Sequence, residues 1–147
     1  MNDLDALEII KRGMSTEIWG QRFYEQAAAC TVAEDGKRVF ESLIQEEERH
    51  LEILCGQYAS LSAGQTWLSL AEARAMADAA DPTTIFPEAT AAEQLIPADA
   101  TDEQALQLAM AFERRGHDFY REQAGATSDA RAKEMWDYLA RAEDQHY

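Results

Sequence analysis

An internal repeat limits the fold of this chain more than any other feature of its sequence. Residues 17–24 read EIWGQRFY and residues 113–120 read ERRGHDFY, so Glu, Gly, Phe and Tyr recur at an offset of 96 residues. The same offset relates Met14 to Met110, Phe40 to Trp136, Leu43 to Leu139, Glu47 to Glu143 and His50 to His146. Such self-similarity indicates one supersecondary unit that occurs twice. We therefore expect two structurally equivalent halves.

Each half has the apolar periodicity of two long helices. The first hairpin covers about 3–60 with a turn at Ala33 to Gly36, and the second covers about 101–147 with turn and cap residues at 127–129. The crossover of about 61–100 contains the capping box Ser69 with Glu72, which predicts a short helix to about Ala79, and all three prolines. Another capping box, Thr101 with Gln104, opens the third long helix.

Two antiparallel hairpins joined by one long crossover between helices 2 and 3 predict an all-α fold, the ferritin-like four-helix bundle. The length of 147 residues fits a single domain over 1–147.

The repeat also duplicates a metal-binding pattern. Glu47 with His50, and Glu143 with His146, are Glu-x-x-His pairs, whose two side chains project from the same face of a helix. The preceding helix of each hairpin carries one further carboxylate, at the height of the Glu-x-x-His pair. The predicted metal ligands are Glu17, Glu47, His50, Glu113, Glu143 and His146.

The cost of burying these carboxylates favours a metal site over a core without metal. Ionised carboxylates among Leu, Met, Phe, Tyr and Trp side chains cost several kcal/mol each when they are unpaired. Two divalent cations would neutralise four carboxylates, and iron and manganese both suit carboxylate and imidazole ligands. Buried Glu–His hydrogen bonding without metal is the alternative. Glu46 and Glu48 flank Glu47, but only Glu47 has a glutamate at its repeat position.

Three further residues lie on the same helix faces as the ligands. Tyr24 and Tyr120 follow Glu17 and Glu113 by seven residues, so they either donate hydrogen bonds to ligand carboxylates or simply pack in the core. His117 is an extra metal ligand, a hydrogen-bond donor to one of the ligands, or a hydrogen-bonded core histidine. Its repeat position is Gln21.

The segments EIWGQRFY with EEERH, and ERRGHDFY with AEDQH, resemble the rubrerythrin branch of the ferritin-like superfamily over nearly the whole chain. The resemblance implies two iron ions, bridged by Glu47 and Glu143. It also implies that four residues are terminal ligands or lie close to the irons: Glu17, His50, Glu113 and His146. It also implies an oxidoreductase that reduces hydrogen peroxide or dioxygen. The 2 cysteines form no CxxC pair of a rubredoxin domain, so an external electron donor is expected.

Two other functions use the same residues differently. A ferroxidase, iron-storage or iron-carrier protein would oxidise iron and deliver it to a store. A metal-free helical interaction protein would bind no metal in stoichiometric amount.

The net charge limits the kinds of partner that the chain can bind, and its N-terminal residues bear on its localisation. The formal net charge of −15 disfavours nucleic acid and anionic membranes. The N-terminal residues fit neither a signal peptide nor a transit peptide, so we expect a cytoplasmic protein.

The fourth helix is predicted to stop near His146, far short of the first helix in length. The expected consequence is an uncovered apolar patch around Leu7, Ile10, Leu106 and Met110, and hence a homodimer or larger homo-oligomer.

Overall fold

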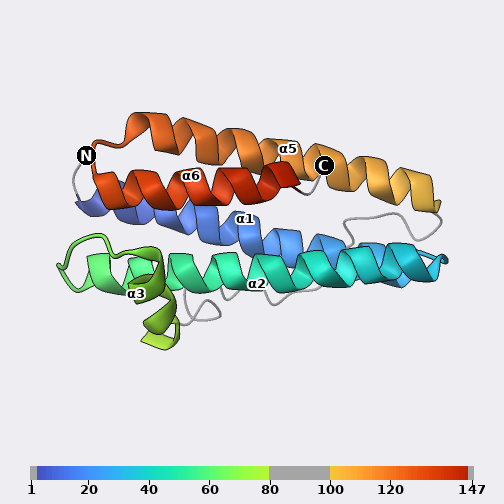
Figure 1. Cartoon of the computed structure of the whole chain (residues 1–147), viewed down its shortest axis with the longest axis horizontal. Coiled ribbons are helices and arrows are strands. Elements are labelled where there is room, and N and C mark those ends of the chain that lie inside the picture. The colour runs from blue at the N-terminus through green and yellow to red at the C-terminus, as the bar shows by residue number, and fades with distance from the viewer. Residues whose placement is uncertain (1–2, 80–99, 146–147) are drawn as a thin grey trace.

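The computed structural model describes residues 3–79 and 100–145, and these residues are all-helical, with no strand among them. The long helices are α1 (Asp3–Cys30), α2 (Glu34–Ser62), α5 (Asp102–Ala126) and α6 (Ala130–Gln145). Short α3 (Leu70–Ala75) and the 3-10 helix η1 (Ala77–Ala79) follow α2. Figure 1 shows the four long helices side by side with α3 crossing one end of α2. Residues 80–99, half of the predicted crossover, lie outside the described residues.

The first hairpin is formed by α1 and α2, with a shorter turn than predicted. Gly36 belongs to the first turn of α2 rather than to the connection, because Ala33 has the extended backbone of an N-cap and Glu34 begins the helix. The turn amides are satisfied from the other hairpin: N–H groups of Val32 and Ala33 donate to the Asp102 carboxylate at 3.1 and 3.4 Å. The start of α5 therefore holds the turn between α1 and α2.

The predicted caps are confirmed. Both capping boxes form, Ser69 with Glu72 before α3 and Thr101 with Gln104 before α5. Asp129 caps α6, because its Oδ1 accepts hydrogen bonds from the N–H groups of Arg131 and Ala132 at 2.9 and 3.0 Å. The short helix is less regular than expected, since α3 ends at Ala75 and a 3-10 turn continues to Ala79.

The segment with α3 is bound tightly to α2. The buried amide of Gln57 pairs with the backbone of Leu68 in both directions, at 2.7 and 2.8 Å. A Cβ atom at Gly56 would lie 1.8 Å from the carbonyl oxygen of Ala73. Glycine at this position is therefore required for α3 to approach the backbone of α2.

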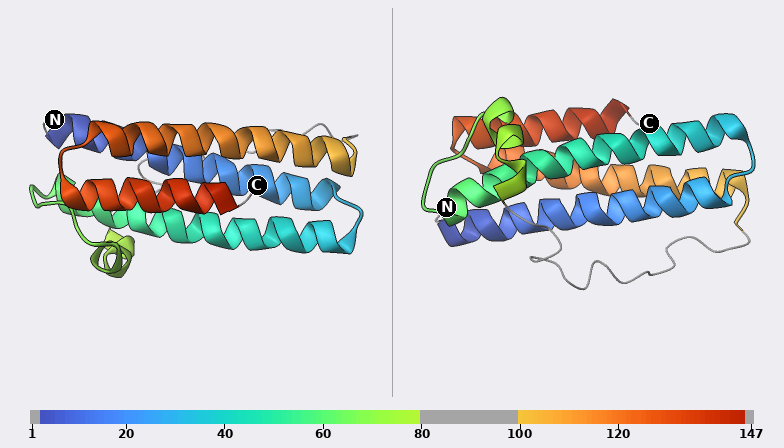
Figure 2. Two further views of the ribbon diagram at one scale, coloured as in Figure 1. Left: turned by 45° about the horizontal axis from the view of Figure 1, so that its top comes forward. Right: turned by 90° about the horizontal axis from the view of Figure 1, so that it is seen from below.

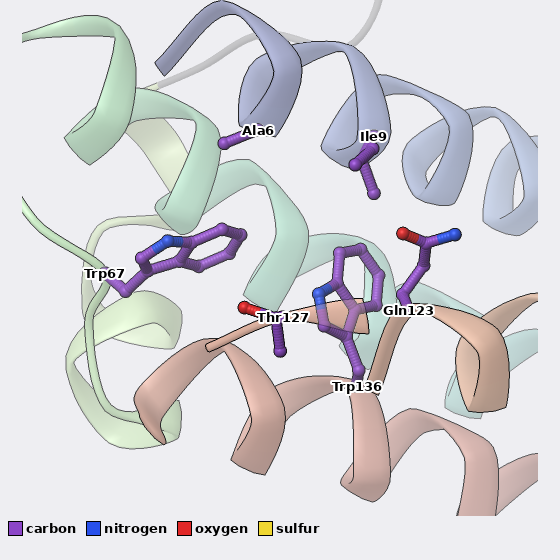
Figure 3. A pocket seen from close by; sticks show the side chains of 6 residues that line it. All are labelled: Ala6, Ile9, Trp67, Gln123, Thr127 and Trp136. Atoms are coloured by element: carbon purple, nitrogen blue, oxygen red, sulfur yellow. The ribbon is translucent and has the colours of Figure 1, made fainter. Parts of the chain in front are cut away.

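One end of the molecule is closed by aromatic packing. Trp67 packs edge-to-face on Trp136 with ring centroids 6.4 Å apart, and Trp136 stacks on Tyr120 at 5.8 Å. Figure 3 shows the two indoles beside Ala6 and Ile9 of α1. This end holds the larger core cluster, which includes Ile10.

At the opposite end α6 stops part-way along the other helices (Figures 1 and 2). Leu106 and Met110 are exposed there, at 51% and 42%, as expected. Ile10 is completely buried and Leu7 packs against the core, so the prediction that both belong to this patch was wrong. The reason is that α1 runs antiparallel to α5, which places Ile10 at the end that α6 covers. Self-association stays a prediction.

No helix among the described residues combines the length and apolar character needed to cross a membrane.

Candidate metal centre

Four acidic and imidazole side chains converge in the middle of the core. Glu17 comes from α1, Glu47 and His50 from α2, and Glu143 from α6. One ligand atom of each lies within 4.8 Å of the corresponding atoms of the others, and all four side chains are buried. The i and i+3 spacing of Glu47 and His50 on α2 brings both to the same face, as the sequence predicts.

Glu17 is the centre of this group. Its Oε1 accepts a hydrogen bond of 2.5 Å from the Tyr120 hydroxyl and lies 3.4 Å from Nδ1 of His50. Burial raises the pKa of Glu17 from 4.5 to about 8, and the nearby charges of Glu143 and Glu113 act in the same direction, while hydrogen bonds from neighbours lower it. Near neutral pH the buried Glu17 side chain therefore carries a proton, unless a cation neutralises its charge.

Two of the six predicted ligands are not in this group. Glu113 is buried, at 3% exposure, and its charge acts on Glu17, but it lies outside the set of atoms within 4.8 Å of one another. His146 lies outside the described residues. The structure therefore brings together Glu17, Glu47, His50 and Glu143, and leaves Glu113 close by.

The two tyrosines of the repeat have different environments. Tyr120 donates to Glu17, and burial together with the Glu17 charge raises its pKa well above 10. Tyr24 is equally buried, but its hydroxyl has no hydrogen-bond partner among the described residues; its ring stacks on Phe40. Tyr120 therefore supports the group directly, and Tyr24 packs in the core.

His117 lies at a distance from these ligands. Its ring is partly exposed, and Nδ1 lies 3.2 Å from the carboxylate of Asp118. It is not one of the residues whose ligand atoms converge. The contact with Asp118 agrees with the interpretation as a hydrogen-bonded histidine, although the ring is only partly buried.

The two glycines of the repeat lie beside the carboxylates, but only Gly20 is at a tight approach. A Cβ atom at Gly20 would lie 3.1 Å from Oε2 of Glu47 and 3.2 Å from the ring of Phe112. At Gly116, the repeat position, a Cβ atom would lie 3.7 Å from Cδ of Glu143. The repeat contains both glycines three residues after Glu17 and Glu113, but a Cβ atom at Gly116 would make only ordinary contacts.

The acidic group lies beside a surface cavity of about 250 Å³ between α2 and α6. His50 lines the cavity, and the ring of Tyr138 packs edge-to-face against the imidazole with centroids 6.1 Å apart. Two arginines, Arg49 and Arg141, complete much of the lining. Nothing in the repeat indicates this cavity, because neither arginine has an arginine at its repeat position.

The donor atoms fit a hard or borderline divalent cation. Carboxylate oxygens with imidazole nitrogen suit iron and manganese, and the sulfur ligands that favour other metals are absent from the converging group. Oε2 of Glu17 is buried and has no hydrogen-bond partner among the described residues. Such an atom is costly in a protein core, and a bound cation would satisfy it.

Comparisons with known proteins give no further assignment. No protein-family model, curated protein or solved structure matches the chain. The interpretation of the site therefore depends on its own residues and their geometry.

Proposed function

We propose that the chain is a di-iron carboxylate protein, a rubrerythrin-like oxidoreductase that reduces hydrogen peroxide or dioxygen. The observation that carries this proposal is the convergence of Glu17, Glu47, His50 and Glu143 within 4.8 Å in a buried core. Glu113 and His146 would complete the set of ligands, because the repeat relates them to Glu17 and His50. The fold class that belongs to this proposal is the ferritin-like four-helix bundle.

The number of buried carboxylates supports two metal ions rather than one. Glu17, Glu47, Glu113 and Glu143 are all at most 3% exposed, so four carboxylates share one core with little access to water. One divalent cation would leave two negative charges uncompensated, whereas two would balance all four. Neutral imidazoles add donor atoms without changing this balance.

The chain's own residues would hold and orient the site. The hydroxyl of Tyr120 fixes the rotamer of Glu17, which α1 alone would leave free, and Gly20 lets the carboxylate of Glu47 approach α1. The surrounding helices exclude bulk water from the carboxylates. When bound, two ferrous ions would supply the two electrons that reduction of one peroxide to two waters requires.

Metal loading tests the proposal. The protein is loaded with ferrous iron without oxygen, desalted, and its metal content measured by elemental analysis; about two ions per chain are expected. Glu47→Gln should lose most of the iron, because it removes a central carboxylate. Glu48→Gln is the matched control, since Glu48 is the exposed neighbour. Equal iron in the Glu47→Gln variant and the wild type would contradict the proposal.

Gly20 and Gly116 provide a second test, with the same substitution at both repeat positions. Gly20→Ala should lower iron affinity about tenfold, because the new methyl group forces the Glu47 carboxylate to move. Gly116→Ala should change affinity little, since its Cβ atom would make only ordinary contacts at 3.7 Å. Equal loss of affinity in both variants would indicate a general helix effect instead.

Rates of oxidation separate the peroxidase from the ferroxidase. In stopped-flow experiments the di-iron protein should react faster with hydrogen peroxide than with dioxygen. Faster reaction with dioxygen, followed by release of ferric iron and reloading, would assign the site to iron oxidation and storage.

A further inference from the structure

The cavity beside His50 has an unusual lining for such an acidic chain. It is lined by two arginines from two helices, Arg49 of α2 and Arg141 of α6, together with Glu46, His50, Tyr138 and Ala142. The chain has 13 basic residues against 28 acidic ones and a net charge of −15. Two guanidinium groups around one cavity, with a single carboxylate, therefore reverse the charge of the surrounding surface.

Neither of these arginines forms an ion pair within the part of the chain that the structure describes. Arg74, Arg121 and Arg131 form ion pairs with carboxylates at 3.1 to 3.6 Å. Within residues 3–79 and 100–145, no ion pair is found for Arg49 or Arg141. In a chain with a twofold excess of acids, pairing was available at many surface positions. Both residues are exposed, so their guanidinium donors are accessible to a ligand in the cavity.

Chemistry identifies the class of ligand. A guanidinium group presents a planar fork of N–H donors that matches the oxygens of a phosphate or carboxylate. Tyr138, which is 40% exposed and lines the same cavity, offers a neutral hydroxyl donor. Glu46 carries the opposing charge, so the lining holds two positive groups and one negative group. Directed hydrogen bonds, rather than charge alone, would bind the ligand.

The volume of the cavity favours a small ligand. The cavity of about 250 Å³ lies below the range of roughly 300–1,000 Å³ that is typical of pockets for drug-sized molecules. We propose that this cavity binds a small oxyanion, a phosphate or a carboxylate, between Arg49 and Arg141. This site adjoins the converging carboxylates, and the two guanidinium groups face the anion from the cavity side. His50 is the residue that the two sites share.

Binding to the metal-free protein tests this inference. Titration calorimetry would measure inorganic phosphate and, separately, acetate, with the wild type, Arg49→Gln, Arg141→Gln and the double variant. Saturable binding is expected, weakened about tenfold or more in each single variant and abolished in the double variant. Arg12→Gln is the matched control, because Arg12 is an exposed arginine of α1 away from the cavity. Circular dichroism verifies that each variant is folded.

Three results would overturn the inference. One is the absence of saturable binding of both anions to the wild type. Another is equal loss in Arg12→Gln, which would indicate diffuse attraction rather than a site. The third is an affinity that does not change in the Arg49→Gln and Arg141→Gln variants. Preference for phosphate or for acetate would then identify which source of oxyanion the site selects.

The inference extends the proposed function but can fail independently of it. Glu47→Gln should lose iron and still bind phosphate in the metal-free state, because Glu47 does not line the cavity. Phosphate binding that occurs only in the iron-loaded protein and ignores both arginines would mean direct ligation of metal, which overturns the anion site alone. Iron retained by Glu47→Gln, with phosphate binding intact, would instead refute only the di-iron proposal.

Discussion

The pH dependence of stability in the metal-free protein should depend strongly on Glu17. This side chain is fully buried, and burial raises its pKa from 4.5 to about 8. Between these two values the folded protein keeps a proton that the unfolded chain has released. A raised carboxyl pKa therefore contributes stability that is complete below pH 4.5 and is lost as the pH rises through about 8.

The magnitude follows from one proton. A difference of one bound proton changes the free energy of unfolding by about 1.4 kcal/mol per pH unit. From pH 4.5 to about 8 the loss attributable to Glu17 is about 5 kcal/mol, which is comparable with the total stability of a small domain. Glu17→Gln removes this contribution, because an amide keeps an acceptor for the Tyr120 hydroxyl and does not ionise.

Urea unfolding in the presence of a chelator, monitored by circular dichroism at pH 5, 6, 7 and 8, measures the effect. Wild-type stability should fall with pH more steeply than that of Glu17→Gln, and the variant should be the more stable protein at pH 8. Glu48→Gln, at an exposed position, should follow the wild type. Parallel slopes for the wild type and Glu17→Gln would refute the reasoning.

Two further predictions use matched pairs of substitutions, both measured by urea unfolding of the metal-free protein. Tyr120→Phe should lower the free energy of unfolding by about 1–3 kcal/mol, because it removes the only hydroxyl donor recorded for Glu17 among the described residues. Tyr24→Phe should not lower it, since that hydroxyl has no recorded partner there; equal losses would contradict the assignment. Gly56→Ala should cost about 3 kcal/mol or more, because its Cβ atom would overlap a backbone carbonyl of α3. Gly125→Ala has open space and should raise stability by up to about 1 kcal/mol, and similar values for both glycines would refute the proposed close approach.

Local signals in the sequence predicted the local structure well. The capping boxes at Ser69 and Thr101 are observed because they need only residues three positions apart. The turn at Gly36 was misplaced for a nonlocal reason, since the amides before α2 are satisfied by Asp102 of the other hairpin. Its position could not be deduced from the turn sequence itself.

The candidate site was predictable to the extent that the repeat determines it. The repeat placed Glu17, Glu47 and Glu143 at one height, and the structure brings their carboxylates together. It could not indicate that Tyr120 contacts Glu17 while Tyr24 contacts no polar group, because repeat positions are identical in sequence and different in surroundings.

The cavity with its arginines was also beyond sequence reasoning. Arg49 and Arg141 are separated by most of the chain, and each alone has the pattern of an ordinary exposed helix residue. Only the packing of α6 against α2 places them around one cavity. Residues that do not follow the repeat can be seen to converge only in the tertiary structure.

The site also links the two hairpins to each other. Glu17, Glu47 and His50 belong to the first hairpin, whereas Glu143 and the supporting Tyr120 belong to the second. Neither hairpin alone can assemble the group, so any cation that binds it stabilises the docked arrangement over separated hairpins. Without a cation the same carboxylates repel one another, and protonation of Glu17 relieves part of that repulsion. A proton and any cation that binds the group would therefore compete for one buried carboxylate, and the stability of the helix arrangement would depend on which of them is bound.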